Sequence, residues 1–312
     1  MDSISSNKVP AINFACEALR PETTSWCSVR TEVRKALEVY GCFEAVFDGK
    51  PQLHQDMLLA LEQYFDLPLE TKIKHNTDTP FDGYPGINPV MPLLDTVAIH
   101  VNQLPFERLQ RFTNLMWPEG NSSFCDNMYS YMKQVCELEK MVKKMIFESF
   151  GVEMYYDSHA NSTNYILRLL KYDAPKTKEI SLGAIQHKDK SFLSILSQNG
   201  VRGLEIQAKD GEWISVEPSA SSFIVIVGEV FMAWSNDRLH CPLHRVMMTG
   251  DDVRYSMAFF SFKEGMLQIP DEMVDEEHPL LYKPFNHRAF HAFATSKGDQ
   301  KFDSQIKAFC GV

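Results

Sequence analysis

The sequence lacks the features that would direct a chain to a membrane or to nucleic acid. It contains no run of 18 apolar residues, so no membrane-spanning helix is expected. The net charge is −10 and no block of lysine and arginine occurs, which argues against nucleic acid and anionic membranes as partners. Residues 1–6 have no apolar signal-peptide core, and Cys310 stands one residue short of a prenylation motif. We therefore expect a cytoplasmic protein.

Cysteine pairs are also missing. The seven cysteines include no Cys-x-x-Cys sequence, and their number is odd. Zinc ribbons and disulfide frameworks use paired cysteines, so the sequence predicts reduced thiols that are mostly packed in the core. No internal repeat or low-complexity tract is present either.

What the chain does contain is a helical first half. The 312 residues, 44% of them hydrophobic, can bury a large core as one domain or two closely joined ones. A short strand is predicted over residues 9–14. Apolar residues with helical spacing, interpreted as packing surfaces, predict helices over residues 28–40, 53–65 and 123–150. We expect residues 1–150 to form a mostly helical N-terminal region.

From about Tyr165 the pattern changes to short β-rich segments separated by turn sequences. These segments cover residues 166–170, 192–196, 223–227 and 255–260. Many short strands after a helical half predict an α+β fold, in which a jelly roll (a double-stranded β-helix) forms the core and helices pack outside. Residues 151–312 would form this core, with a helical stretch over residues 282–308.

The most informative pattern is formed by His187 and Asp189, which stand two residues apart. On a β-strand this spacing puts both side chains on one face, because strand side chains alternate. A second histidine, His244, follows 55 positions after Asp189. Two imidazoles and one carboxylate make the facial triad of non-haem Fe(II) oxygenases, which leaves the opposite metal positions open for a substrate and O₂. We predict that these three residues bind Fe(II).

Ten positions beyond His244, Arg254 and Ser256 repeat the two-residue spacing. On a strand they would project a guanidinium fork and a hydroxyl together, and this pair suits a carboxylate. Tyr172 follows the first β-rich segment and could donate its hydroxyl to the same carboxylate, although a single tyrosine at such a position is often a core residue.

Each part of this pattern has a plainer interpretation. The histidines could be hydrogen-bonded core residues, with Arg254 in a surface ion pair. His240 and His244 also match the His-x-x-x-His spacing of helical zinc sites. Such a site needs glutamate directly after the first histidine, where Cys241 stands, and Pro242 would break the helix. The combined residue types and spacings favour the iron site, with His244 as a ligand and His240 in a loop or behind the ligands.

These motifs resemble the plant 2-oxoglutarate/Fe(II)-dependent dioxygenase superfamily over nearly the whole chain. The resemblance is carried by Val9-Pro10-Ala11-Ile12, Tyr40-Gly41-Cys42-Phe43, His187-Lys188-Asp189, His244-Arg245-Val246 and Arg254-Tyr255-Ser256. Its AOP-like branch includes glucosinolate side-chain enzymes, steroidal glycoalkaloid hydroxylases and auxin-oxidising dioxygenases. The sequences similar to that branch are Asp210-Gly211-Glu212-Trp213, Met232-Ala233-Trp234-Ser235-Asn236-Asp237-Arg238 and residues 275–285.

Three positions depart from the family pattern. Leu170 replaces an asparagine that often stands two residues before the tyrosine, here Tyr172. Asp237 stands where glycine is common, and Lys188 where threonine is common. None of these changes removes a ligand. Leu170 makes the pocket less polar beside the metal, and Lys188 points away from the metal by strand alternation.

The resemblance implies an enzyme that uses Fe(II), O₂ and 2-oxoglutarate, with ascorbate as reductant. The metal ligands would be His187, Asp189 and His244, and the co-substrate ligands Arg254, Ser256 and Tyr172. Oxidative decarboxylation to succinate and CO₂ would drive the hydroxylation of a small specialised plant metabolite, alkaloid-like, steroid-like or hormone-like. Desaturation or dealkylation by the same chemistry is one alternative, and a catalytically silent jelly roll that binds a small ligand is another.

The AOP-like resemblance and Leu170 point to a substrate with a hydrophobic reacting region. A steroidal or other alkaloid skeleton, an auxin-type indole or a glucosinolate side chain would fit. Candidates to line the pocket are Leu170, Phe231, Phe260 and Phe262, the last two on the strand face of Ser256 by alternation. The three phenylalanines could equally fill the sheet core. We expect a monomer that acts on a small molecule.

Overall fold

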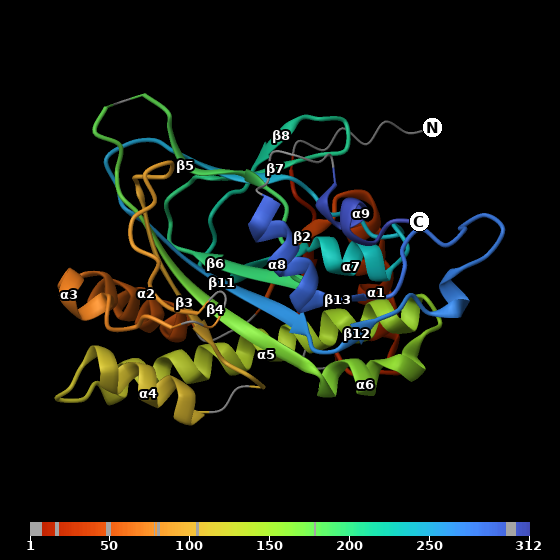
Figure 1. Cartoon of the computed structure of the whole chain (residues 1–312), viewed down its shortest axis with the longest axis horizontal. Helices are drawn as coiled ribbons and strands as arrows, with labels where there is room; N and C mark the ends of the chain where they lie inside the picture. The colour runs from red at the N-terminus through yellow and green to blue at the C-terminus, as the bar shows by residue number, and fades with distance from the viewer. Residues whose placement is uncertain are drawn as a thin grey trace.

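Two β-sheets form the centre of the computed structural model, which describes residues 8–15, 19–47, 51–77, 79, 82–103, 106–177, 179–297 and 304–312. The large sheet has seven strands in the order β1-β2-β9-β6-β11-β4-β3. A four-stranded sheet, β5-β10-β7-β8, lies over it, and helices surround both (Figure 1). The predicted α+β fold with a jelly-roll core is confirmed.

The large sheet takes strands from both halves of the chain. Its strands are β1 (Ala11–Asn13), β2 (Cys42–Val46), β3 (Leu94–His100), β4 (Thr163–Tyr172), β6 (Leu193–Gln198), β9 (Ser222–Val227) and β11 (Arg254–Lys263). β1 runs parallel to β2, and the other neighbours are antiparallel. Residues 1–150 therefore complete both edges of this sheet.

The small sheet carries two of the predicted metal ligands. Its strands are β5 (Ser181–His187), β7 (Leu204–Gln207), β8 (Trp213–Ser215) and β10 (His244–Met248). His244 at the start of β10 is paired in register with His187 at the end of β5. A third sheet joins β12 (Met266–Leu267) to β13 (Phe285–Asn286).

The helices pack around this pair of sheets. They are α1 (Thr24–Val39), α2 (Pro51–Phe65), α3 (Leu69–Lys72), α4 (Phe106–Met116), α5 (Ser122–Ser149), α6 (Tyr156–Asn161), α7 (Glu229–Trp234), α8 (His287–Lys297) and α9 (Gln305–Cys310). Short 3₁₀ turns cover Glu153–Tyr155 and Asp271–Met273. The predicted long helices are present. The predicted C-terminal helical stretch begins later than expected, because β13 precedes α8.

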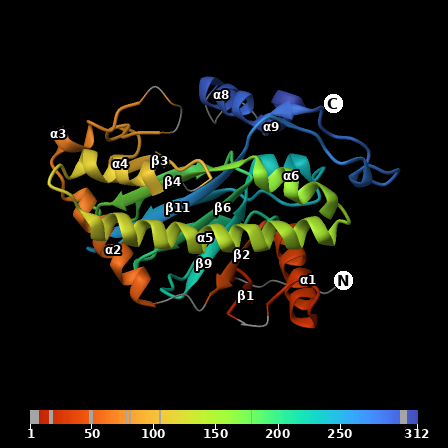
Figure 2. The same cartoon turned by 90° about the horizontal axis from the view of Figure 1, so that it is seen from below.

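Helix α5 runs across one face of the large sheet and packs against α1, α2 and α4 (Figure 2). Its predicted apolar stripe is buried there, which confirms that the stripe is a packing surface. The cysteines follow the same rule: Cys42, Cys125, Cys136, Cys241 and Cys310 are buried and unpaired, Cys27 is exposed, and Cys16 lies outside the described residues. Within the described part of the chain, no helix combines the length and apolar composition needed to cross a membrane.

The turn after α7 accounts for the aspartate at the position where glycine is common. Asn236 and Asp237 adopt left-handed backbone conformations with φ of 55° and 63°, which asparagine and aspartate tolerate better than most residues. The Asp237 carboxylate accepts a hydrogen bond from the Tyr282 hydroxyl and lies 2.6 Å from the Lys307 ammonium. These contacts join the turn to the C-terminal segment, which glycine could not do.

Candidate active site

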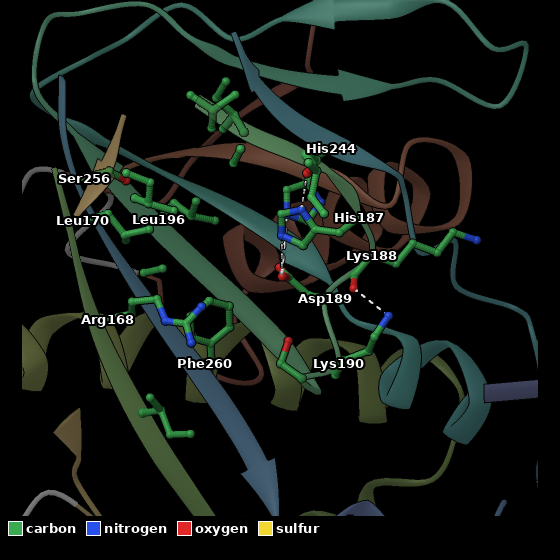
Figure 3. Close-up of a pocket in the computed structure, with 18 of the residues that line it drawn as sticks. Arg168, Leu170, His187, Lys188, Asp189, Lys190, Leu196, His244, Ser256 and Phe260 are labelled. Carbon is green, nitrogen blue, oxygen red and sulfur yellow. Dashed lines mark hydrogen bonds and ion pairs between the residues drawn. The ribbon is translucent and has the colours of Figure 1, made fainter. Parts of the chain in front are cut away.

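His187, Asp189 and His244 meet between the two sheets. Asp189 lies two residues beyond the end of β5, in the loop that follows it, rather than on the strand as predicted. The three side chains nevertheless converge (Figure 3), and their ligand atoms all lie within 4.8 Å of one another. Asp189 Oδ1 is 3.7 Å from His187 Nε2 and 3.6 Å from His244 Nε2. Two imidazole nitrogens and a carboxylate oxygen thus face one point.

Hydrogen bonds turn both imidazoles toward this point. His187 Nδ1 donates to the Ile185 carbonyl at 2.8 Å, and His244 Nδ1 donates to the Pro242 carbonyl at 3.5 Å. Because a carbonyl only accepts, each Nδ1 carries a proton, and in the neutral imidazole Nε2 then keeps a free lone pair. This tautomer is the one that a metal bound at Nε2 requires.

The charges at this point also suit a metal. Burial, and next the neighbouring His244, lower the pKa of His187 to about 4, so His187 is neutral at physiological pH. Burial opposes ionisation of Asp189, but His244 and His187 outweigh it and hold the pKa of Asp189 well below its usual range. Burial lowers the pKa of His244, while the Asp189 charge raises it, and the net shift is upward. An ionised carboxylate held between two histidines is a set of donors for a divalent cation.

The loop that carries Asp189 is held in place from two helices. The Asp189 carbonyl accepts a hydrogen bond from the Glu229 backbone N–H at 2.8 Å, at the start of α7. The Glu229 carboxylate lies 2.7 Å from the Lys190 ammonium, and His287 Nε2 in α8 donates to the Lys190 carbonyl at 2.7 Å. These contacts fix the position of Asp189, which lies beyond the end of β5 and is not held by the sheet.

Lys188 and His240 do not belong to the cluster. Figure 3 shows Lys188 extending away from Asp189 and His187, as strand alternation predicted. His240 lies in the loop before β10, where its backbone N–H bonds to the Leu37 carbonyl at 3.0 Å. The group of potential metal ligands found among the described residues does not include His240.

A cavity of about 430 Å³ opens beside the three ligands and extends to Arg254. Arg254 is only 1% exposed, and its Nη2 donates to Gln198 Oε1 at 2.5 Å. Its Nε and Nη1 are buried without a hydrogen-bond partner. A buried guanidinium with unpaired donors is costly in free energy unless a ligand completes it. The residues present therefore fit both a metal and a carboxylate ligand in the same cavity.

Tyr172 and Ser256 lie next to Arg254. Tyr172 faces Arg254 across the β4–β11 pair, and its ring centre is 5.0 Å from Arg254 Cζ. Ser256 Oγ donates to the Ser197 carbonyl at 3.0 Å and lines the cavity. The structure thus brings together the three residues that the sequence pattern grouped around a carboxylate.

Of the four predicted substrate-pocket residues, three line the cavity. Leu170 lies near Ser256, and Phe260 and Phe262 are half-buried further along β11. Phe231 is placed elsewhere: it is fully buried, and its ring stacks on Phe192 at a centroid distance of 3.9 Å. Phe231 belongs to helix α7 and packs into the core. The prediction that it lines the pocket is wrong.

Sequence reasoning missed two polar residues of this region. Gln198 holds the Arg254 guanidinium, and Arg168 lines the cavity from the middle of β4. The signal for Arg168 was present, because it is the one charged residue within residues 165–170 and by alternation must share a face with Leu170 and Tyr172. Gln198 is the first residue of a turn sequence, and its contact with Arg254 depends on the pairing of β6 with β11.

Comparisons with known proteins agree with this geometry. A family model described as "2OG-Fe(II) oxygenase superfamily" matches residues 155–263. "Probable 2-oxoglutarate-dependent dioxygenase AOP1.2" of Arabidopsis thaliana is 42% identical over 313 residues, which cover 97% of this chain and 96% of the relative. The rice dioxygenase for auxin oxidation has a TM-score of 0.82 at 25% identity, covering 98% of this chain and 100% of that chain. JOX2, solved with 2OG, Fe and JA, has a TM-score of 0.80 at 23% identity, covering 97% and 89%.

The match with the relative from Arabidopsis thaliana extends well beyond the catalytic core. The family model spans the three ligands and Arg254, while the relative is similar from the first strands to the C-terminal segment. The helices and strands contributed by residues 1–150 are therefore shared as well. The chain belongs to the 2-oxoglutarate- and Fe(II)-dependent dioxygenases, within the plant AOP-like branch.

Proposed function

We propose that this dioxygenase hydroxylates a small specialised plant metabolite with an apolar reacting region. The observation that supports this most directly is that one cavity joins a His/Asp/His cluster, in which Asp189 and His244 are buried, to a buried guanidinium with two unpaired nitrogens. The first suits Fe(II), and the second suits the distal carboxylate of 2-oxoglutarate. Few other functions need both in one place.

In this proposal His187, Asp189 and His244 hold Fe(II) from one side. Fe(II) with 2-oxoglutarate and O₂ supplies an oxidant for C–H bonds as the co-substrate is converted to succinate and CO₂. The Nδ1 hydrogen bonds of the two histidines fix the ring orientations, and the contacts of Lys190 and Glu229 fix the Asp189 loop. The contribution of the chain is a rigid set of three ligands with an open side.

Arg254 anchors the co-substrate in this proposal. Either Nε or Nη1, together with the second N–H of Nη2, can donate two parallel hydrogen bonds to a carboxylate, while Gln198 accepts the other N–H of Nη2. The Tyr172 ring packs under the guanidinium, and Ser256 places a hydroxyl beside it. Binding at this position would remove the cost of the unpaired donors, which favours a carboxylate over water.

The substrate would lie further along β11, against Leu170, Phe260 and Phe262. These apolar side chains exclude water from the side of the cavity next to the metal, which protects a reactive oxidant from side reactions. The two similar structures are named for auxin oxidation and for a complex with JA. Auxin, JA, glucosinolates and steroidal alkaloids are therefore the first compounds to test.

The test is a screen of plant metabolites with purified protein, Fe(II), 2-oxoglutarate and ascorbate, the last added to keep the iron reduced. Products are followed by mass spectrometry, and succinate is measured in parallel. A product 16 mass units heavier than the substrate supports hydroxylation. A product 2 mass units lighter would show that the reaction is a desaturation instead. A protein that binds a metabolite but forms neither succinate nor product would be a catalytically silent binder.

A further inference from the structure

Arg168 is a second arginine in the cavity, at a place where the reaction itself requires none. It stands at the centre of β4 and is paired in register with Ala258 of β11. Its neighbours on the same strand face, Ile166 and Leu170, are apolar and also line the cavity. Arg168 therefore brings a charged group to the part of the cavity that is otherwise suited to an apolar substrate.

The Arg168 guanidinium has no protein partner that would explain its presence. Among the residues that the structure describes, no hydrogen bond or ion pair reaches it, and its Nε is buried without a partner. Its closest aromatic neighbour is Phe260, whose ring centre lies 5.9 Å from Cζ (Figure 3). Arg168 is half-buried and only its Nε is enclosed, so its other N–H groups are open to the cavity and can pair with an anionic ligand there.

Asp189 is the one carboxylate among the described residues that line the cavity, and it belongs to the metal cluster. Four cationic side chains line the same cavity, Arg168, Arg254, Lys188 and Lys190, and Lys190 is held in an ion pair. Asp189 and doubly charged 2-oxoglutarate would carry three negative charges. With Fe(II) bound, the positive charges would exceed these, so the loaded cavity would favour a further anion.

Arg168 and Arg254 are placed to hold two different anions. Arg254 is paired with Tyr172, which lies four residues from Arg168 along β4, about 13 Å at the usual rise per strand residue. Arg254 is at the Tyr172 end of the strand pair, and Arg168 is near Phe260. An anion at Arg168 would thus lie beside the apolar residues assigned to the substrate rather than in the co-substrate position.

We infer that Arg168 binds a carboxylate of the organic substrate, so that the enzyme acts on acids with an apolar body. The planar guanidinium can grip a carboxylate with two hydrogen bonds, while Phe260 and Phe262 contact the apolar part. This orientation presents a C–H bond of the apolar body to the open side of the metal site. The inference rests on the proposed function, since it places the acid in the same cavity as the co-substrate.

The experiment compares matched acids and amides. Protein loaded with Mn(II) and 2-oxoglutarate under argon, where no turnover occurs, is titrated with phenylacetate, 3-phenylpropionate and 2-naphthylacetate, and with the amide of each. Isothermal titration calorimetry gives the affinities. We expect the best acid to bind roughly tenfold or more tightly than its amide, because a charge-assisted pair is lost in the amide. In Arg168→Met and Arg168→Gln this preference should fall below about twofold.

The controls separate this inference from the proposed function. Both Arg168 variants should bind 2-oxoglutarate as the unaltered protein does, whereas Arg254→Met should lose that binding. Arg168→Lys, which keeps the charge without the fork, should retain part of the preference, and thermal melting shows that each variant is folded. A series in which no acid outbinds its amide, a preference that survives in Arg168→Met and Arg168→Gln, or loss of 2-oxoglutarate binding in those variants would overturn the inference. Failure of the unaltered protein to bind 2-oxoglutarate would instead refute the proposed function.

Discussion

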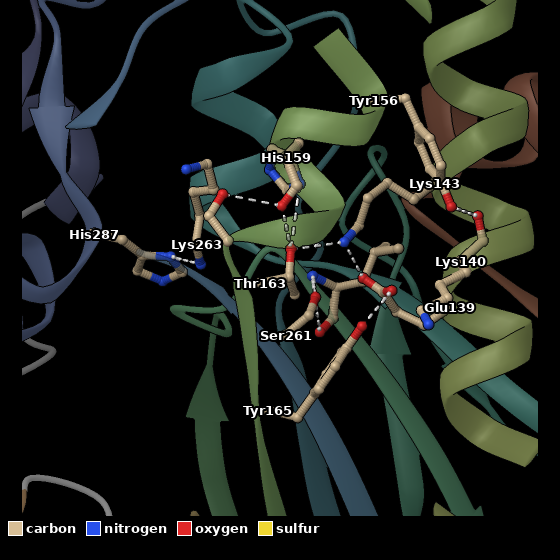
Figure 4. A network of polar contacts seen from close by, with 12 residues as sticks. Glu139, Lys140, Lys143, Tyr156, His159, Thr163, Tyr165, Ser261, Lys263 and His287 are labelled. Atoms are coloured by element: carbon tan, nitrogen blue, oxygen red, sulfur yellow. Dashed lines mark hydrogen bonds and ion pairs between the residues drawn. The ribbon is translucent and has the colours of Figure 1, made fainter. Parts of the chain in front are cut away.

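Strand β4 separates two groups of polar side chains that differ in what they contact. On the side toward α5, the Glu139 carboxylate and the Lys143 ammonium lie 2.7 Å apart (Figure 4). Lys143 Nζ donates to Thr163 Oγ1 at 3.2 Å, and the Tyr165 hydroxyl donates to Glu139 at 3.3 Å. On the side toward the cavity, Arg168 and the neighbouring Arg254 keep nitrogen atoms without any protein partner.

The difference follows from alternation along a single strand. Odd-numbered residues of β4, such as Thr163 and Tyr165, meet the helix, while even-numbered residues, such as Arg168 and Tyr172, line the cavity. A buried charge that has an internal counter-charge belongs to the fold, because removing its partner leaves it uncompensated. A charge that faces the cavity without one is free to pair with a bound ligand. Changes on the cavity side should therefore alter activity, and changes on the α5 side should alter stability.

The largest effect on activity is expected from the metal ligands. His187→Ala removes one of the three metal ligands. Loss of a residue that only hydrogen-bonds to a ligand costs up to roughly 100-fold in activity, so turnover should fall by more than that. Succinate release and iron content per chain measure this. The matched control is Lys188→Ala, which changes the adjacent residue that points away from the cluster and should leave both quantities unchanged. Full iron content and turnover in His187→Ala would refute the assignment.

The largest effect on stability is expected from the opposite side of β4. Lys143→Met leaves the Glu139 carboxylate buried without its partner, so the free energy of unfolding should fall by about 3–5 kcal/mol. Urea denaturation measures this. The double variant Glu139→Met, Lys143→Met removes both charges and should recover most of the loss. If Lys143→Met instead raised the KM for 2-oxoglutarate without loss of stability, the division between the two sides would fail.

A smaller effect, confined to the co-substrate, is expected from Arg254→Lys. Lysine keeps the charge but cannot form two parallel hydrogen bonds, so the KM for 2-oxoglutarate should rise roughly tenfold. Steady-state succinate formation at varied 2-oxoglutarate measures this, and iron binding should stay intact. An unchanged KM would mean that another residue anchors the 2-oxoglutarate carboxylate. Arg168→Lys, the same change at the other arginine of the cavity, is the variant to measure in parallel.

The local parts of this site could be predicted because they depend on spacing alone. The two-residue spacing identified His187 with Asp189 and Arg254 with Ser256, and the change of period near Tyr165 identified the β-rich core. Parts that depend on pairing between distant segments could not be obtained in this way. Examples are the positions of β1 and β3 as the edge strands of the large sheet, and the hydrogen bond between Arg254 and Gln198.

Two predictions, the strand position of Asp189 and the pocket position of Phe231, were wrong for physical reasons that the structure shows. Asp189 lies beyond the end of β5, so contacts with α7 and α8 rather than strand alternation hold it beside His187. Phe231 was assigned to the pocket although it belongs to a helix that packs into the core. By contrast, a charged residue among the apolar residues 165–170 was visible in the sequence. Knowing which face of the sheet Arg168 occupies would have been enough to place it in the cavity.

The smallest effect, and the sharpest test of the cavity side, comes from two phenylalanines. Phe262 is half-buried, and its ring packs against His287 at 4.8 Å and His291 at 5.7 Å, whereas Phe231 is fully enclosed in the core. Phe262→Ala should lower substrate oxidation by about tenfold or less, since it removes apolar contact from the pocket, while decarboxylation without substrate oxidation persists. Phe231→Ala should instead lower the free energy of unfolding by about 3–5 kcal/mol, because it leaves a cavity in the core. The ratio of succinate to oxidised product, measured with the compound found in the screen, and urea denaturation together separate the two outcomes. If Phe262→Ala lost decarboxylation, oxidation and stability together, its ring would be part of the core, and the substrate would contact the cavity elsewhere.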